Sequence, residues 1–163
     1  MNAITHTEAE IWQLLEQVCD PEVPVLTVVD LGVIRHVAIN NNVAEITITP
    51  TYSGCPAMNA IETDIKILMS SYNIPVSINT ILFPAWTTDW MSEKGKEKLK
   101  AYGIAPPQYQ VSNALFSTPQ NIECPLCNST NTQLISEFGS TACKSLYKCN
   151  DCLEPFDYFK CLK

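Results

Sequence analysis

The sequence predicts an α+β fold in two parts, a small mixed α/β domain followed by a C-terminal β module built around a metal ion. Apolar patterns of helical and strand type alternate up to Gly103. Six of the eight cysteines lie in the last 40 residues, and four of them form two Cys-X-X-Cys pairs. Prolines mark the stretch between these regions. We therefore expect an α/β domain over residues 1–103, a linker over 104–121 and a β module over 122–163.

The composition is that of a globular chain, with 46% apolar and 17% charged residues. A formal charge of −7 argues against a nucleic-acid surface, which needs clustered Lys and Arg. The N-terminus has no secretory pattern, and no apolar run is long enough to span a membrane. We expect a cytoplasmic protein whose cysteines are thiols or metal ligands.

The first element is predicted to be a helix that starts at a capping box, Thr7-Glu8-Ala9-Glu10. Ile11, Leu14, Leu15 and Val18 then form one apolar face, and Pro21 and Pro24 are expected to end the helix.

Two strands, Val33–Asn40 and Val43–Thr49, are predicted next. Asn41-Asn42 separates them, and Asn tolerates positive φ, so a tight hairpin fits. In the second run apolar and polar residues alternate, which indicates one buried and one solvated face.

The turn at Tyr52-Ser53-Gly54-Cys55-Pro56 leads into a second helix that reaches about Ser71, with Pro56 suited to its first position. A third strand follows at about Val76–Phe83. Ser92 is expected to cap a short helix that ends near Gly103.

The C-terminal module contains two metal-binding turns, Cys124-Pro125-Leu126-Cys127 and Cys149-Asn150-Asp151-Cys152, separated by 21 residues. Four thiolates at this spacing can close a tetrahedron around Zn²⁺. Thr132–Glu137 and Lys144–Lys148 are predicted to pair as a hairpin, and Phe156–Lys160 to add a strand, which is the layout of a zinc ribbon. A rubredoxin-like iron site is the chemical alternative.

Cys143 and Cys161 lie outside this pattern. Each can be a small buried apolar residue, or the two can form a second thiol pair.

Cys55 has the sequence context of a functional thiol, because a helix that starts at Pro56 would place it at the N-cap. The helix dipole and the free N–H groups there would lower the pKa of the thiol. The structural alternative is a cysteine that simply fits the turn.

Asp20, Glu22 and Asp30 place carboxylates in the turns between the first helix and the hairpin. They can cap those turns or contribute to a site at Cys55. The chain shows no acid–base pair suited to catalysis and no glycine-rich phosphate loop, so we expect no enzymatic turnover.

Asp20-Pro21-Glu22, Asp30-Leu31-Gly32 and Thr51-Tyr52-Ser53-Gly54-Cys55-Pro56 together resemble the MIP18 (DUF59) family of iron–sulfur assembly factors. Four later segments resemble the PaaD (PaaJ) family of the phenylacetyl-CoA epoxidase system: Trp86-Thr87-Thr88-Asp89-Trp90, Gly103-Ile104-Ala105-Pro106-Pro107, Phe138-Gly139-Ser140-Thr141-Ala142-Cys143-Lys144 and Glu154-Pro155-Phe156-Asp157. The resemblance implies an iron–sulfur-assembly domain followed by a structural zinc ribbon.

The implied function is assembly or maturation of iron–sulfur clusters in the multicomponent phenylacetyl-CoA oxygenase, with the iron–sulfur reductase component as the expected partner. Cys55 would contact iron or a transient cluster, and Asp20, Glu22, Asp30 and Thr51 would shape its pocket. Two alternatives are a structural oxygenase subunit without cluster chemistry and a rubredoxin-like electron carrier. Whether the chain forms a homodimer is left open.

Overall fold

The computed structural model describes residues 6–108 and 121–160, and the chain divides into two compact units between Gly95 and Lys96. Each unit is described by itself. Within the described ranges, no helix combines the length and apolar character needed to cross a bilayer. The predicted α+β class is confirmed, with a mixed α/β first part and a C-terminal sheet that carries four clustered cysteines.

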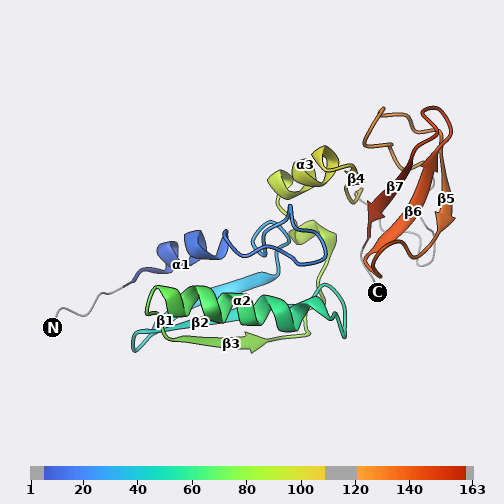
Figure 1. Ribbon diagram of the computed structural model, residues 1–163. Helices are drawn as coiled ribbons and strands as arrows, with labels where there is room; N and C mark the ends of the chain where they lie inside the picture. Colours follow the sequence, from blue (N-terminus) through green and yellow to red (C-terminus); the bar gives the residue numbers. More distant parts are fainter. Residues whose placement is uncertain (1–5, 109–120, 161–163) are drawn as a thin grey trace. The chain divides into compact units, whose positions relative to one another are not determined.

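The first unit contains a three-stranded sheet in the order β1-β2-β3 (Figure 1). β1 (Ile34–Asn40) and β2 (Val43–Ile48) are antiparallel, and β3 (Val76–Thr80) runs parallel to β2. The hairpin prediction is confirmed, because Asn41 and Asn42 both have positive φ, at 50° and 63°. A register shift between Ile34 and His36 interrupts the alternation of buried residues in β1.

Two helices cover the sheet: α1 (Glu8–Leu15) packs on β1, α2 (Ala57–Ser71) packs on β3, and the helices contact each other. The capping box of α1 is present, with Thr7 and Glu10 exchanging hydrogen bonds. α1 ends at Leu15, before Val18, which is nevertheless buried in the following loop.

The order of the strands brings three loops to one end of this sheet. β1 begins there, and β2 and β3 both end there, because β2 is antiparallel to β1 and parallel to β3. Two backbone hydrogen bonds continue the pairing past the strand ends, from Thr49 N to Val33 O and from Ile81 N to Ile48 O, each 2.9 Å. The loop that leads to Cys55 therefore leaves the sheet beside the loop that follows β3.

The third strand is shorter than predicted. It ends at Thr80, and residues 82–85 are exposed. Pro84 cannot donate a ladder hydrogen bond, which is a sequence signal against continuing the strand. A 3-10 helix η1 (Thr88–Trp90) and helix α3 (Glu93–Ala101) follow, and Ser92 caps α3 as predicted by accepting from Gly95 N at 2.9 Å.

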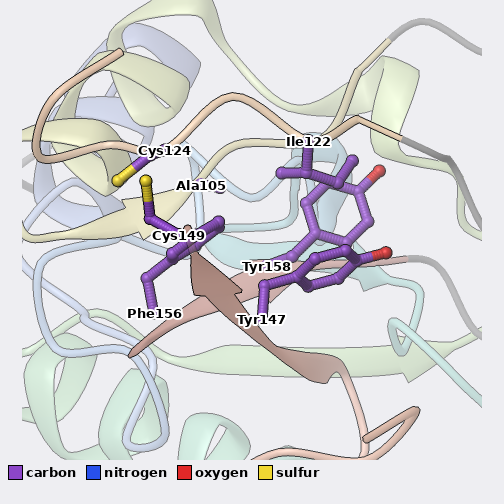
Figure 2. Close-up of a cluster of buried hydrophobic side chains, with 7 residues drawn as sticks. All are labelled: Ala105, Ile122, Cys124, Tyr147, Cys149, Phe156 and Tyr158. Atoms are coloured by element: carbon purple, nitrogen blue, oxygen red, sulfur yellow. The ribbon is translucent and has the colours of Figure 1, made fainter. Parts of the chain in front are cut away.

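The second unit contains a four-stranded sheet in the order β4-β7-β6-β5. The predicted ribbon strands are present as β5 (Thr132–Ser136), β6 (Lys144–Cys149) and β7 (Pro155–Phe159). β6 pairs antiparallel with both β5 and β7. Their buried face carries Tyr147, whose ring stacks on Phe156 and meets Tyr158 edge-on, with centroids 5.8 Å apart in both pairs (Figure 2).

The linker prediction is corrected at its start. Ile104–Ala105, assigned to the linker, forms β4, which pairs parallel to β7. Ala105 is part of the buried cluster of the ribbon, so this strand is held by packing that no local pattern shows. Most of the remaining predicted linker, residues 109–120, lies outside the described residues.

Candidate functional site

The four cysteines of the two Cys-X-X-Cys turns come together in the ribbon. Their Sγ atoms all lie within 4.8 Å of one another. Cys124 and Cys152 are 3.8 Å apart between sulfurs, and Cys127 and Cys149 are 3.5 Å apart. Four thiolates at ~2.3 Å from one tetrahedral ion would lie ~3.8 Å from each other, so the donor set fits zinc without rearrangement.

Both turns end on a residue with left-handed backbone. Asn128 follows Cys127 with φ of 60°, and Leu153 follows Cys152 with φ of 67°. Asn adopts this conformation readily, whereas Leu is strained in it. The two turns are therefore built alike although their sequences differ at this position.

A polar network ties the second turn to the segment after the first. The carboxylate of Asp151 accepts hydrogen bonds from the Ser129 hydroxyl and, at 2.8 Å, from Asn131 Nδ2. These hydrogen bonds lower the pKa of Asp151 below its usual range, and the bond from Ser129 makes the largest contribution. Asn150 N also donates to Asn131 O at 2.9 Å. The network fixes the spacing of the two cysteine pairs.

The thiols themselves are uneven in acidity. Backbone donation from Cys152 N, 3.5 Å from the sulfur of Cys149, is the main factor that lowers the pKa of Cys149 to about 7. For Cys127, a backbone hydrogen bond from Ser129 favours the thiolate, but desolvation and the neighbouring sulfurs outweigh it and raise its pKa to about 12. A cation bound among these sulfurs would favour the thiolate form of all four.

Two of the four clustered cysteines also belong to the core. Cys124 and Cys149 are fully buried members of the cluster that contains Tyr147, Phe156 and Ile122, and Figure 2 shows their sulfurs at one edge of it. An ion bound by the four sulfurs would therefore be coupled to the packing of the ribbon through the same side chains.

Cys143 is buried, and its sulfur lies 3.1 Å from the Thr141 hydroxyl. Cys161 lies outside the described residues, so the second thiol pair stays a prediction.

Cys55 lies just before α2, one position earlier than predicted. Pro56 occupies the N-cap, and the helix begins at Ala57. Cys55 N donates to Tyr52 O at 3.2 Å, and Cys55 O accepts from Met58 N at 3.3 Å, so the cysteine closes a turn and starts the helix. Gly54 has φ of 81°, and a Cβ built there would meet nothing within 4 Å. The half-buried Cys55 thus follows an open turn at the end of the sheet.

Asp20 and Asp30 are both buried and both hold turns of the loop before β1. Asp20 Oδ1 accepts from Glu22 N at 2.7 Å and from Val23 N at 2.8 Å. Asp30 Oδ2 accepts from Thr27 N at 3.2 Å, and its Oδ1 accepts from the Ser92 hydroxyl at 3.0 Å. These bonds give the two carboxylates a capping role, the structural alternative considered for them.

Thr51 lies half-buried in the loop between β2 and Cys55. Near it, at the end of β2, the hydroxyl of Thr49 is buried and makes no hydrogen bond within the part of the chain that the structure describes. The sequence pattern did not single out Thr49, because a threonine at a strand end is ordinary until its burial is known.

Two family models match the chain. An iron–sulfur cluster assembly protein model matches residues 8–71, and a PaaD zinc beta ribbon domain model matches residues 108–160. A protein of Escherichia coli (strain K12), named as a subunit of 1,2-phenylacetyl-CoA epoxidase, is 51% identical over 154 residues, which cover 94% of this chain and 92% of that protein. The chain belongs to the PaaD family.

Two further relatives match the first part. An Fe-S protein maturation auxiliary factor of Porphyromonas gingivalis is 35% identical over 101 residues, covering 60% of this chain and 95% of that protein. The crystal structure of a DUF59 domain from Bacillus anthracis superposes with a TM-score of 0.53 at 33% identity, covering 56% of this chain and 90% of that one. This PaaD family member therefore combines an iron–sulfur assembly domain with a zinc-ribbon domain.

Proposed function

We propose that the chain is a maturation factor that assists insertion of an iron–sulfur cluster into the reductase component of a phenylacetyl-CoA oxygenase. The observation that carries the proposal is the position of Cys55. Its thiol follows the open turn at Gly54, at the start of α2, in the part that matches the iron–sulfur assembly model. Thiolate is a good ligand for iron, and a single thiol that remains accessible suits transient contact with a cluster.

The carboxylates support this site through the backbone. Asp20 and Asp30 fix the turns of the loop that leads into β1. β1 begins at the end of the sheet from which the Cys55 loop departs. We assign them, with Glu22 and Thr51, to positioning of the loops around Cys55. This assignment requires no carboxylate ligand to iron, and Cys55 Sγ alone makes the contact.

In the ribbon, Cys124, Cys127, Cys149 and Cys152 would hold one zinc ion whose function is structural. Four thiolates leave no open coordination position, so the ion activates no substrate. The ribbon contributes a fold that the metal stabilises.

The proposal is tested by co-expressing the chain with the reductase component and measuring iron and acid-labile sulfide per reductase. Cys55→Ala is expected to abolish the gain in cluster content that the wild-type chain gives. Cys19→Ala is the matched control, since Cys19 is an exposed thiol of the same unit. Equal cluster content with wild type and Cys55→Ala would contradict the proposal.

A structural subunit without cluster chemistry is the second candidate, supported by the similarity to a protein named as an epoxidase subunit. It predicts stoichiometric copurification with the oxygenase components and cluster content that does not depend on Cys55. The same co-expression experiment separates the two functions.

A further inference from the structure

Residues 82–85 form an exposed apolar segment directly after β3. Leu82 is 65% exposed and Phe83 is 89% exposed, and Pro84 and Ala85 are exposed as well. Single exposed apolar side chains are ordinary on protein surfaces, but four in succession are not. Such a run marks a place where a partner excludes water.

The segment is fixed at both ends. On one side, Ile81 N donates to Ile48 O at 2.9 Å and continues the pairing of β3 with β2. On the other side, Trp86 is buried, and its Nε1 donates to Leu31 O at 2.9 Å. Phe83 is thus presented by a short loop with anchored ends, which reduces the entropy lost when a partner covers it.

The segment leaves the sheet beside the loop that carries Cys55. Ile48 and Thr80 are partners in the parallel pairing of β2 and β3, so both loops start at the same end of adjacent strands. A protein that covers Phe83 would bind at this end of the sheet, where α2 begins and Cys55 lies just before it (Figure 1).

The charge of the unit indicates the kind of partner. Residues 1–95 contain eleven acidic and three basic side chains, a formal charge of −8, whereas residues 96–163 contain six acidic and seven basic ones. Two of the three cations are engaged, Lys66 by Glu62 at 3.7 Å and Arg35 on the ring of Trp90 at 3.4 Å. Glu62 also accepts from the Thr80 hydroxyl at 3.1 Å, which places a carboxylate next to the start of the segment.

We propose that Leu82–Ala85 is the docking surface for the protein that receives the cluster, and that this protein offers an apolar pocket bordered by lysine and arginine side chains. The inference rests on the proposed function for the identity of the recipient, the reductase component. It adds that docking and iron contact use different residues: Phe83 binds the recipient, and Cys55 acts on it.

The test measures binding of the full chain to the apo-reductase at low and at high salt, and cluster content in the same preparations. Phe83→Ser is expected to weaken binding by about tenfold or more, as truncation of a buried aromatic anchor does. High salt is expected to weaken binding of the wild-type chain relative to low salt. Ile67→Ser is the control, because Ile67 is another large exposed apolar residue of this unit, at 62%, and lies ten positions along α2 from its start. Unchanged thermal unfolding would show that each variant is folded.

The outcomes separate this inference from the proposed function. Cys55→Ala is expected to bind like wild type and yet give no cluster, whereas excess Phe83→Ser protein is expected to restore cluster content. If Cys55→Ala gives full cluster content while Phe83→Ser binds weakly, the proposed function fails and the docking surface stands. Docking at this segment is overturned if Phe83→Ser binds like wild type, if Ile67→Ser is equally impaired, or if the wild-type chain does not bind the reductase. Binding that does not respond to salt overturns the basic pocket.

Discussion

The Sγ atoms of Cys124 and Cys152 lie 3.8 Å apart although 28 positions separate the residues in sequence. Together with the pair Cys127 and Cys149, this distance defines a tetrahedral site for one ion. Because Cys124 and Cys149 lie in the buried cluster of the ribbon, an ion held by these sulfurs would stabilise the core.

The first prediction concerns that metal. The purified chain is expected to contain one zinc per molecule and to show no visible absorption, which a rubredoxin-like iron would give. Cys149→Ser should lose the metal and unfold the ribbon, since structural zinc contributes on the order of 10 kcal/mol to such modules. Cys143→Ser is the control, because Cys143 is buried but lies outside the four-sulfur cluster. Metal analysis and amide exchange measure both effects, and retention of metal by Cys149→Ser would contradict the site.

The second prediction concerns the strained end of the second cysteine turn. Leu153→Asn is expected to raise the stability of the ribbon by about 1 kcal/mol, because Asn adopts positive φ at lower cost than Leu. Leu153 is 65% exposed, so little packing is lost. Leu126→Asn is the control: Leu126 is 56% exposed in the first turn and has negative φ. Thermal unfolding of the zinc-loaded protein would show an equal gain in both variants if strain were not the cause.

The third prediction concerns the buried hydroxyl of Thr49. Thr49→Val should stabilise the first unit by about 1 kcal/mol, since it keeps the side-chain shape and removes a buried hydroxyl that has no hydrogen-bond partner among the described residues. Thr47→Val, at a half-buried position two residues earlier in β2, should give no comparable gain. Denaturant unfolding measures the difference, and a loss of stability in Thr49→Val would reveal a partner for this hydroxyl.

The fourth prediction concerns the contact of Asp30 with Ser92. Asp30→Ala leaves Thr27 N and the Ser92 hydroxyl without their acceptor, and is expected to cost about 1–3 kcal/mol. Asp64→Ala, which removes an exposed carboxylate from α2, should be close to neutral. If Asp30→Ala unfolds at the same denaturant concentration as wild type, the capping role is wrong.

The fifth prediction concerns pH and the capping box of α1. The Thr7 backbone N–H donates to the Glu10 carboxylate at 2.8 Å and lowers the pKa of Glu10 from its ordinary value. A carboxyl group whose pKa is lower in the folded state than in the unfolded state stabilises the fold at pH values above its unfolded-state pKa. This contribution to stability is lost as the pH falls through the folded-state pKa. Wild type should therefore be more stable than Glu10→Gln near neutral pH, and the difference should vanish in acid. The measurement is the unfolding temperature of both proteins from neutral to acidic pH. A difference that stays constant with pH would show that the charge of Glu10 is irrelevant.

Several features were predictable because neighbours in sequence determine them. Thr7 and Glu10 are three residues apart and form their capping box locally, and Asn41-Asn42 adopts the positive φ values that a tight hairpin needs. The four ribbon cysteines were predictable for a chemical reason, since the doubled Cys-X-X-Cys spacing suits one tetrahedral ion. Even Cys55 was placed within one residue, because Pro56 marks the helix start.

Other features depended on partners that are distant in sequence. Nothing in Ile104–Ala105 distinguishes a strand from a linker until β7 pairs with it, and Leu82-Phe83 resembles the end of a buried strand until the sheet leaves it exposed. Asp30 meets Ser92 only after the chain between them has folded. The sequence by itself thus determined the first helix start and the hairpin turn, whose energies are local, and the cysteine spacing that brings four sulfurs together. The tertiary structure alone decided which apolar residues are covered, because burial is a property of the surface that packs against them.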